Sequence, residues 1–424
     1  MLNSIIQKTL FLIIFLTFLS CLTDVTDDMK VKKFNAKSIE TLTKDLDLTL
    51  FSSIEHTSKI PIIAWMGVPQ NHTNIVRFQE MKDAGITISM SNYTNSDSLQ
   101  KALDIAYQLN LKVMIRCPEL YNNTEKTVLR FKDHPANGGY FLLDEPITSE
   151  FPKLKELLQK IEAIDSTHFC YINLFPNVAM PELYSPIDYR NYVALFLNKI
   201  PVKILSFDHY PIVNGFIRVN WYQNLEIIQS EADKAGIHFW AFALTTAHDY
   251  YPIPDLAQLR LQVYSNLAYG AKGIQYFTYW TPTSNRWDFH KGPIDVDGSK
   301  TIVYDYLQQM NNEIQNYSLI FLTSKTIKVS HFGEIPLETK ELTSLPYFVK
   351  SIKIKGGNAL LSEMKNEMNY FFMIQNTNLN KEIGIDIQTD LQTKIVLKNG
   401  YIIPANLIKE EFKLTPGDMV IFMR

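Results

Sequence analysis

The stretch LAQLRLQVYSNLAYGAKGIQYFTYW (256–280) carries a predicted helix and a predicted strand in one run. Its first part, up to Ala271, is expected to be helical, and the apolar run GIQYFTYW (273–280) follows it. That run lacks strict alternation of polar and apolar residues, which is typical of a strand buried on both faces of a parallel sheet. The stretch therefore predicts one helix–strand unit of an α/β fold.

The same pattern recurs along most of the chain. Predicted helices such as 98–110 and 153–164 alternate with short apolar runs. Eight such units over about 260 residues match the size of a (β/α)8 barrel. A doubly wound open sheet is the competing fold, but the sequence has neither G-x-G-x-x-G nor a Walker loop. The other predicted strands are IPIIAWMG (60–67), ITISMS (86–91), KVMIRC (112–117), GGYFLLDEP (138–146), HFCYINLF (168–175), KILSFDHYP (203–211) and HFWAFALTT (238–246).

Glycines stand between several of these predicted helices and strands. Gly85, Gly236 and Gly273 each lie just before a strand. Glycine at that place favours a helix C-cap that turns into the strand, and we expect this role for all three.

Both ends of the chain differ from the barrel. Residues 1–21 hold the apolar run TLFLIIFLTFLS (9–20), too short to cross a bilayer comfortably and typical of a signal peptide. Residues 18–21, Phe-Leu-Ser-Cys, resemble a bacterial lipoprotein box, which implies lipidation of Cys21 and a cell-envelope location, at the outer membrane or cell surface. An ordinary cleaved signal with an incidental cysteine is the alternative. We expect a tether and lead-in segment over 22–58, the barrel over 59–324 and a small antiparallel β-sandwich over 325–424.

Composition excludes several classes of protein. The 424 residues carry 41 Lys and Arg against 44 Asp and Glu, a net charge of −3, which argues against a nucleic-acid binder. Three cysteines cannot build a disulfide framework. The nine histidines are dispersed and H-E-x-x-H is absent, so we expect no metal and no other cofactor. G-x-S-x-G, the signature of a serine hydrolase, is also absent.

The carboxyl ends of the predicted strands carry the candidate chemistry, because barrel active sites lie there. Glycoside hydrolysis needs two carboxyl groups, one to protonate the leaving oxygen and one to act as nucleophile or base. Glu145 is the first candidate for the acid, although Asp144 or Glu145 could instead cap the next helix. Alternation along a strand leads us to expect that only one of these two points into the mouth. Asp208 is the candidate partner, with Asp249 and Glu119 as alternatives.

Aromatic, amide and cationic side chains at the same strand ends suit a sugar ligand, because aromatic rings stack on apolar sugar faces and polar groups bind hydroxyls. Arg116 is expected to keep a carboxylate ionised or to recognise an acidic sugar, and a buried ion pair is equally consistent with its position. Ordinary barrel packing is an equally good explanation for the aromatics. The candidate substrate-binding residues are Trp65, Asn92, Tyr93, Arg116, Asn173, His209, Tyr210, Tyr279 and Trp280.

Three stretches, HPANGGYFLLDEP (134–146), KILSFDHYP and LAYGAKGIQYFTYWTP (267–282), resemble clan-A (β/α)8 glycoside hydrolases, near family 42 and its bacterial surface relatives. In that clan the acid/base is a Glu at the end of strand four, commonly after Asn and before Pro. The resemblance assigns this role to Glu145, with Asp144 in place of the Asn.

One strand departs from the resemblance. The clan's nucleophile is a Glu at the end of strand seven, where this chain has Ala243-Leu244-Thr245. The sequence thus predicts a glycoside hydrolase acting on an oligo- or polysaccharide, with a glycan-binding barrel that has lost catalysis as the alternative. A lyase or aldolase is a weaker alternative, because the predicted strand ends carry no lysine suited to a Schiff base.

Overall fold

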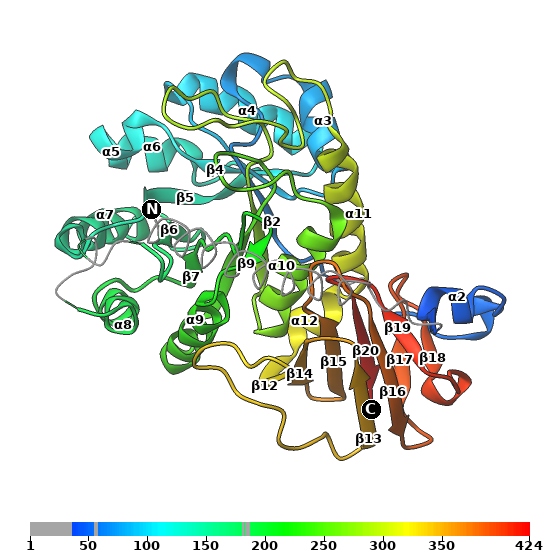
Figure 1. Ribbon diagram of the computed structural model, residues 1–424. Helices are drawn as coiled ribbons and strands as arrows, with labels where there is room; N and C mark the ends of the chain where they lie inside the picture. Colours follow the sequence, from blue (N-terminus) through cyan, green and yellow to red (C-terminus); the bar gives the residue numbers. More distant parts are fainter. Residues whose placement is uncertain (1–35, 55–57, 180–181, 183–186) are drawn as a thin grey trace, which may run out of the picture. The chain divides into compact units, whose positions relative to one another are not determined.

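A closed barrel of eight parallel strands forms the centre of the computed structural model, which describes residues 36–54, 58–179, 182 and 187–424 (Figure 1). The strand order β10-β11-β2-β3-β4-β5-β6-β7 confirms the predicted (β/α)8 fold, since all eight predicted runs supply a strand. The strands are β2 (Ile62–Trp65), β3 (Ile88–Met90), β4 (Lys112–Ile115), β5 (Asn137–Asp144), β6 (Cys170–Leu174), β7 (Ile204–Phe207), β10 (His238–Leu244) and β11 (Gly273–Phe277).

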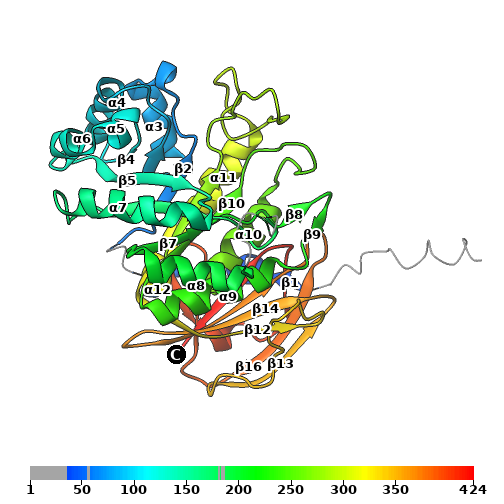
Figure 2. The same cartoon turned by 90° about the vertical axis from the view of Figure 1, so that its left-hand side faces the viewer.

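Helices connect these strands along the outside of the barrel. Their buried faces pack against the outer side of the strands in one large apolar cluster. Figure 2 shows α7, α8 and α9 along the same side of the barrel, where neighbouring helices contact one another. The helices are α3 (Ile75–Asp83), α4 (Ser96–Gln108), α5 (Pro118–Asn122), α6 (Thr124–Phe131), α7 (Phe151–Glu162), α8 (Tyr189–Lys199), α9 (Trp221–Ala235), α10 (Leu256–Ala268), α11 (Ile302–Asn316) and α12 (Ser318–Thr323).

Side chains of alternate strand residues fill the barrel interior. Trp65, Phe141, Tyr171, Trp240 and Phe242 dominate this inner cluster. The ring of Trp65 lies 5.6 Å from that of Phe141 and 5.3 Å from that of Phe242, so the barrel interior around these rings is a packed core, not a channel.

The three inter-element glycines have different roles. Gly85 and Gly236 adopt positive φ angles of 82° and 69°, and Gly236 caps α9 as predicted. The prediction for Gly273 is wrong, because Gly270 (φ 101°) makes that turn. Gly273 begins β11, and a Cβ atom there would lie 2.7 Å from the Trp240 ring, so close packing is what requires glycine.

Two further sheets follow the barrel. The order β12-β14-β15-β20-β17-β18 makes one sheet, and β1-β19-β16-β13 makes the other. Both sheets contribute side chains to a second apolar cluster, and that they form a β-sandwich stays a prediction. Their strands are β1 (Lys37–Ser38), β12 (Lys325–Phe332), β13 (Val349–Lys355), β14 (Ala359–Lys365), β15 (Tyr370–Asn376), β16 (Ile383–Thr389), β17 (Lys394–Val396), β18 (Ile402–Pro404), β19 (Phe412–Leu414) and β20 (Met419–Met423).

The lead-in segment belongs structurally to these sheets. Strand β1 pairs with β19 in parallel, and the short helix α2 (Ile39–Thr43) follows it directly. The segment predicted as tether and lead-in is therefore bound to the C-terminal region at residues 37–38.

Buried polar contacts join the C-terminal sheets to the barrel helices. Gln375 on β15 donates to the carbonyls of Arg260 and Leu261 at 3.2 Å each, and Ser265 donates to Gln375 at 2.9 Å. Near them, Glu313 on α11 binds the Arg260 guanidinium in a bidentate pair and accepts from Tyr264 at 2.7 Å. These contacts fix α10 between barrel and sheet.

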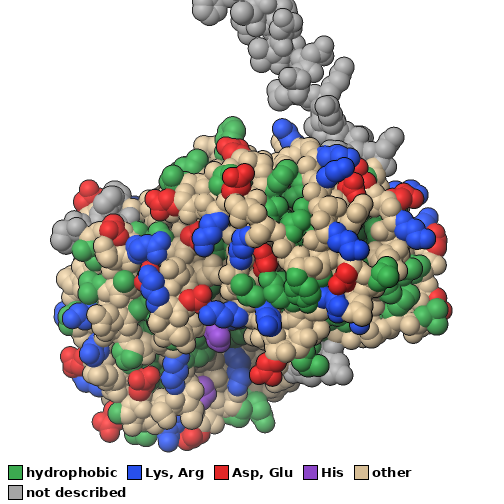
Figure 3. Space-filling view, turned by 90° about the horizontal axis from the view of Figure 1, so that it is seen from below, with side chains coloured by type: hydrophobic (Ala, Val, Ile, Leu, Met, Phe, Trp, Pro, Cys, Tyr) green, Lys and Arg blue, Asp and Glu red, His purple; other side chains and the backbone are tan. Residues whose placement is uncertain are grey.

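The surface carries charges of both signs. On the face shown in Figure 3, lysine and arginine side chains are intermixed with aspartate and glutamate. Within the described part of the chain, no helix is both long and apolar enough to cross a membrane. The predicted signal segment and Cys21 lie outside the described residues.

Candidate functional site

The mouth of the barrel, at the carboxyl ends of its strands, holds three acidic side chains from two non-adjacent strands. Asp144 ends β5, Glu145 follows it, and Asp208 follows β7. Asn173 on the intervening strand β6 links two of them, because its amide nitrogen donates to Asp144 Oδ1 and to Asp208 Oδ1 at 3.1 Å each. Two bonds from one nitrogen place these carboxylate oxygens within about 6 Å of each other.

A hydrogen-bond network below the mouth orients Asn173. Ser206 on β7 donates to Asn173 Oδ1 at 2.8 Å, and Gln275 donates to Ser206 at 2.8 Å. Tyr171 bonds both Ser206 and Gln275. Because Asn173 is 1% exposed and both ends of its amide are bound, it positions carboxylates and does not face a ligand, which corrects its predicted role as a hydroxyl ligand.

Asp144 and Glu145 both interact electrostatically with Asp208, and that only one of them points into the mouth stays a prediction. A register shift between Phe141 and Leu143 brings Asp144 opposite Asn173 on β6. Glu145 then adopts a left-handed conformation (φ 50°), stays partly exposed and interacts electrostatically with both Asp144 and Asp208. Both members of the pair therefore contribute to the same acidic cluster.

Burial and mutual repulsion control the protonation of this cluster. Burial, and then the charge of Asp144, raises the pKa of the Glu145 carboxyl to about 7. Burial, and then the charges of Glu145 and Asp144, raises the pKa of Asp208 well above its ordinary value. Asp144 is exposed, but partial loss of hydration raises its pKa, while the Asn173 amide and the Arg116 guanidinium oppose that rise.

Arg116 lies on the inner side of the barrel next to this cluster. Its guanidinium carbon lies 4.0 Å from the centre of the Phe141 ring and 5.8 Å from that of Trp65. The positive charge of Arg116 acts on Asp144 at the mouth of the barrel and therefore favours the ionised form of Asp144.

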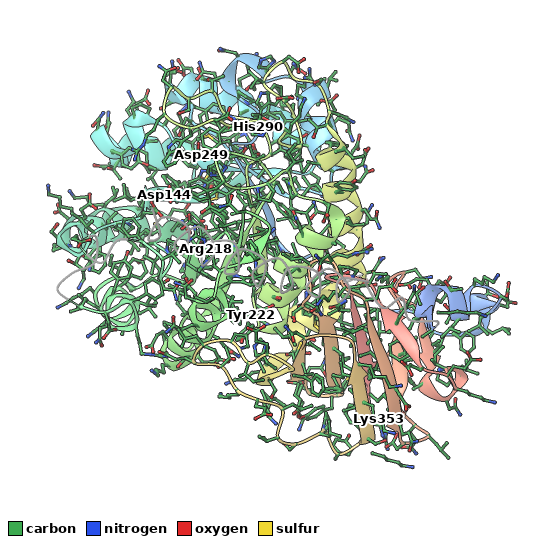
Figure 4. The ribbon with its side chains drawn as sticks, in the orientation of Figure 1. Asp144, Arg218, Tyr222, Asp249, His290 and Lys353 are labelled. Atoms are coloured by element: carbon green, nitrogen blue, oxygen red, sulfur yellow. The ribbon has the colours of Figure 1, made fainter. Side chains whose placement is uncertain are left out.

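Tyr210 also lies on the inner side, half-buried after β7. Its ring is 5.4 Å from that of Phe277 and 6.0 Å from that of Tyr251. Tyr251 accepts a bond of 3.1 Å from Arg218. Figure 4 labels Asp144, Arg218 and Asp249 on the barrel, whereas Lys353 lies on β13 of the C-terminal sheets.

Several predicted ligand residues are buried. Trp65 (4% exposed) belongs to the inner core, while Tyr93 (3%) and Tyr279 (1%) pack in the outer cluster between strands and helices. His209 (1%) bonds Asn224 on α9 at 2.9 Å, and burial lowers its pKa to about 3. These four side chains are at most 4% exposed, and their contacts with a ligand stay predictions.

The remaining candidates lie elsewhere around the mouth. Trp280 is 5% exposed, but with Asn92, which is exposed, it lines a hollow of about 430 Å³. Glu119 accepts from the backbone of Ser96 at 3.1 Å, at the start of α4, and so has a local structural partner. Asp249 is exposed on the loop after β10 and lines a separate hollow.

Sequence reasoning did not single out Tyr171, Ser206 and Gln275. Tyr171 and Ser206 lie two residues before Asn173 and Asp208, and Gln275 lies two before the end of β11, so the period of two along each strand was the available signal. Within the described residues no group of three or more His, Cys, Asp or Glu side chains has the arrangement of a metal site.

Comparison with known proteins gives structural likenesses only. No protein-family model and no curated protein matches the sequence. A β-galactosidase from Bacillus circulans sp. alkalophilus is similar with a TM-score of 0.57 at 9% identity, over 86% of this chain and 99% of the other. A glycoside hydrolase family 42 β-galactosidase from G. stearothermophilus is similar with a TM-score of 0.55 at 8% identity, over 88% and 99%.

A third likeness is partial. The alignment with a β-galactosidase from the psychrophilic Marinomonas ef1 covers 61% of this chain and 60% of the other, at 10% identity and a TM-score of 0.47. At such identities structural likeness shows the fold and not the activity. The chain thus shares its fold with solved β-galactosidases, one of them a family 42 glycoside hydrolase.

Proposed function

We propose that this protein is a glycoside hydrolase that cleaves O-glycosidic bonds of an oligo- or polysaccharide at the mouth of its barrel. The observation that carries the proposal is the acidic cluster joined by Asn173, in which burial raises the pKa of Glu145 to about 7. A carboxyl group with a pKa near neutrality is suited to give and take protons at physiological pH. The fold shared with solved β-galactosidases supports the same proposal, and we would test β-galactosides among the first substrates.

Glu145 is the proposed general acid and Asp208 the proposed nucleophile or general base. Below neutral pH Glu145 holds its proton and can donate it to the leaving oxygen. Protonation of Glu145 also removes one of the charges that raise the pKa of Asp208. A neutral Glu145 therefore favours the ionised form of Asp208, which hydrolysis needs, whereas burial, the largest cause of the raised Asp208 pKa, opposes that ionisation.

Asp144 and Arg116 are proposed to support this pair. Asp144 shares the Asn173 amide with Asp208, and its charge contributes to the raised pKa of Glu145. Arg116 supplies the compensating positive charge. If the Glu145 and Asp208 carboxyl groups lie about 5–5.5 Å apart the reaction retains anomeric configuration, and at about 6.5–9.5 Å it inverts.

A glycan-binding barrel without catalysis is the second candidate. The end of β10, where the resembling enzymes place a nucleophile, carries Thr245 and Thr246 instead. Both hydroxyls donate to the Thr278 carbonyl, at 2.8 and 3.1 Å, so this strand end is bound within the wall of the barrel. Under this alternative the protein binds sugars but releases no reducing ends.

The decisive experiment incubates the purified protein with a panel of polysaccharides and aryl glycosides and measures released reducing ends and aglycone. Glu145→Gln is expected to lose activity while retaining sugar binding. The matched control is Glu156→Gln, because Glu156 is an exposed carboxylate on α7 and its loss should leave activity unchanged. Binding without hydrolysis by the wild type would favour the second candidate. Absence of both binding and hydrolysis across the panel would reject both candidates.

We further propose that the chain is anchored to the bacterial cell envelope by a lipid on Cys21. The proposal rests on the apolar run 9–20 directly before that cysteine. Metabolic labelling with a fatty-acid analogue should mark the wild type and not Cys21→Ala. Equal labelling of both would refute the proposal.

A further inference from the structure

The long loop between β11 and α11 builds two hollows on the mouth of the barrel. One, of about 500 Å³, lies between this loop and Asp249 on the loop after β10. The other, of about 430 Å³, lies between this loop and the ends of β2 and β3, and Pro282, Thr283 and Val296 line both hollows. Each volume is within the range of ligand pockets.

The loop is held in place by hydrogen bonds across its base. Thr281 donates both its backbone N–H and its hydroxyl to the Ile294 carbonyl at 2.8 Å each, and the backbone N–H of His290 donates to the Ala247 carbonyl at 2.9 Å. A Cβ atom on Gly292 would lie 2.5 Å from Thr246 Oγ1, so the loop packs closely on the end of β10. Figure 4 labels Asp249 and His290, which come from the two joined loops.

Trp287 gives the first hollow an accessible aromatic surface. Of the five tryptophans, the other four are at most 5% exposed, whereas Trp287 is 40% exposed. The Arg286 guanidinium carbon lies 4.9 Å from the centre of its ring, and the hollow is also lined by Asp249, Asn285 and Asp288. An open ring surrounded by carboxylate, amide and guanidinium groups has the chemistry of a sugar subsite.

A series of aromatic rings connects Trp287 to the acidic cluster. Trp287 lies 6.3 Å from His248, His248 lies 5.9 Å from Phe277, and Phe277 lies 5.4 Å from Tyr210. Tyr210 is two residues after Asp208, whose charge acts on it. The first hollow therefore lies outside the acidic cluster, and packed aromatic rings link Trp287 in its wall to Tyr210, next to Asp208.

We infer that the loop between β11 and α11 forms accessory sugar-binding subsites, with Trp287 as the stacking platform of the first hollow. With such subsites, the ligand would be a chain of several sugar units that lies along the mouth of the barrel, and not a single terminal sugar. The inference rests on the proposed function and deepens it. Binding should accordingly strengthen with chain length, and Trp287 should be responsible for much of the gain.

The test uses the full protein carrying Glu145→Gln, so that sugars are bound and not consumed. Calorimetry measures the affinity for galacto-, manno-, gluco- and xylo-oligosaccharides of one to six units. In the oligosaccharide series that binds, affinity is expected to increase about tenfold between two and five units. Trp287→Ala should reduce the affinity about tenfold for the five-unit sugar and less than twofold for the single sugar. Trp287→Phe should retain most of the gain, and Tyr347→Ala, an exposed aromatic (74%) on the segment before β13, should behave as the parent protein.

The outcomes separate the two proposals. Binding that is independent of length, or a length dependence that Trp287→Ala leaves unchanged, overturns the accessory subsites and leaves the proposed function intact. Failure of every sugar to bind, of any length, overturns the proposed function together with the subsites. Equal losses for one and five units would show that Trp287 acts on the acidic cluster and not on a distant subsite, which also overturns the inference.

Discussion

Replacing Glu145 by Gln is expected to stabilise the folded protein above neutral pH. The folded state holds the pKa of this carboxyl at about 7, against its ordinary value of 4.5. At about 1.36 kcal/mol per pKa unit, the ionised side chain reduces the free energy of unfolding by about 3 kcal/mol at pH 8. Gln keeps the shape of the side chain and removes the charge, so the variant should regain most of that free energy.

The direction of the pH dependence follows from proton binding in the two states. Between pH 4.5 and about 7 the unfolded chain has released the Glu145 proton while the folded protein still holds it. The stabilising contribution of that proton is therefore present at low pH and is lost as the pH rises through this window. Removal of the Glu145 charge also lowers the raised pKa of Asp208, which increases the stabilisation of the variant in the same direction.

The assay is urea unfolding of the wild type, Glu145→Gln and Glu156→Gln at pH 4, 6 and 8. The advantage of Glu145→Gln over the wild type should be small at pH 4, where both states bind the proton, and should grow to about 3 kcal/mol at pH 8. Glu156→Gln should show no such growth, since Glu156 is an exposed partner of Lys160. An advantage that is absent at pH 8, or equal at all three pH values, would refute the account of Glu145 as a carboxyl kept neutral by its surroundings.

Three more predictions concern the supporting residues. Asn173→Ala removes the amide that holds Asp144 and Asp208, and kcat should fall by about 10²-fold with an unchanged circular dichroism spectrum; an active variant would contradict this role. Arg116→Gln removes the cation that favours ionised Asp144, so the pKa of Asp144, followed by NMR titration of its carboxyl, should rise by about one unit, and an unchanged Asp144 pKa would show that Arg116 does not control this titration. Glu313→Ala leaves the buried Arg260 unpaired and should reduce the free energy of urea unfolding by about 3 kcal/mol; a loss no larger than that of the exposed Glu156→Ala would refute it.

Much of the architecture could be predicted because barrel strands are buried on both faces. Their apolar runs are visible in sequence, and the alternation with helices implies a parallel sheet. The antiparallel strands expected over 325–424 are present as β12 to β20. Strand β1 was not expected, because a two-residue strand has no pattern of its own.

The aromatic residues show where sequence reasoning about the site failed. Trp65, Tyr93 and Tyr279 stand at strand ends in sequence, yet they are buried. Apolar rings serve equally well for core packing and for sugar stacking, so residue type does not decide between the two. Trp287, which lies in a loop without periodicity, is the exposed tryptophan.

The sequence by itself determined the barrel and the strand ends at which acidic residues gather, because burial on both faces leaves a periodic record along the chain. Only the tertiary structure decided that Asp144 shares Asn173 with Asp208, because that contact depends on a register shift in β5 and on the neighbouring strand β6. A one-residue shift changes the face on which every following side chain lies, and nothing local in the sequence marks it. The raised pKa of Glu145 likewise arises from burial and from charges that the closed barrel brings together.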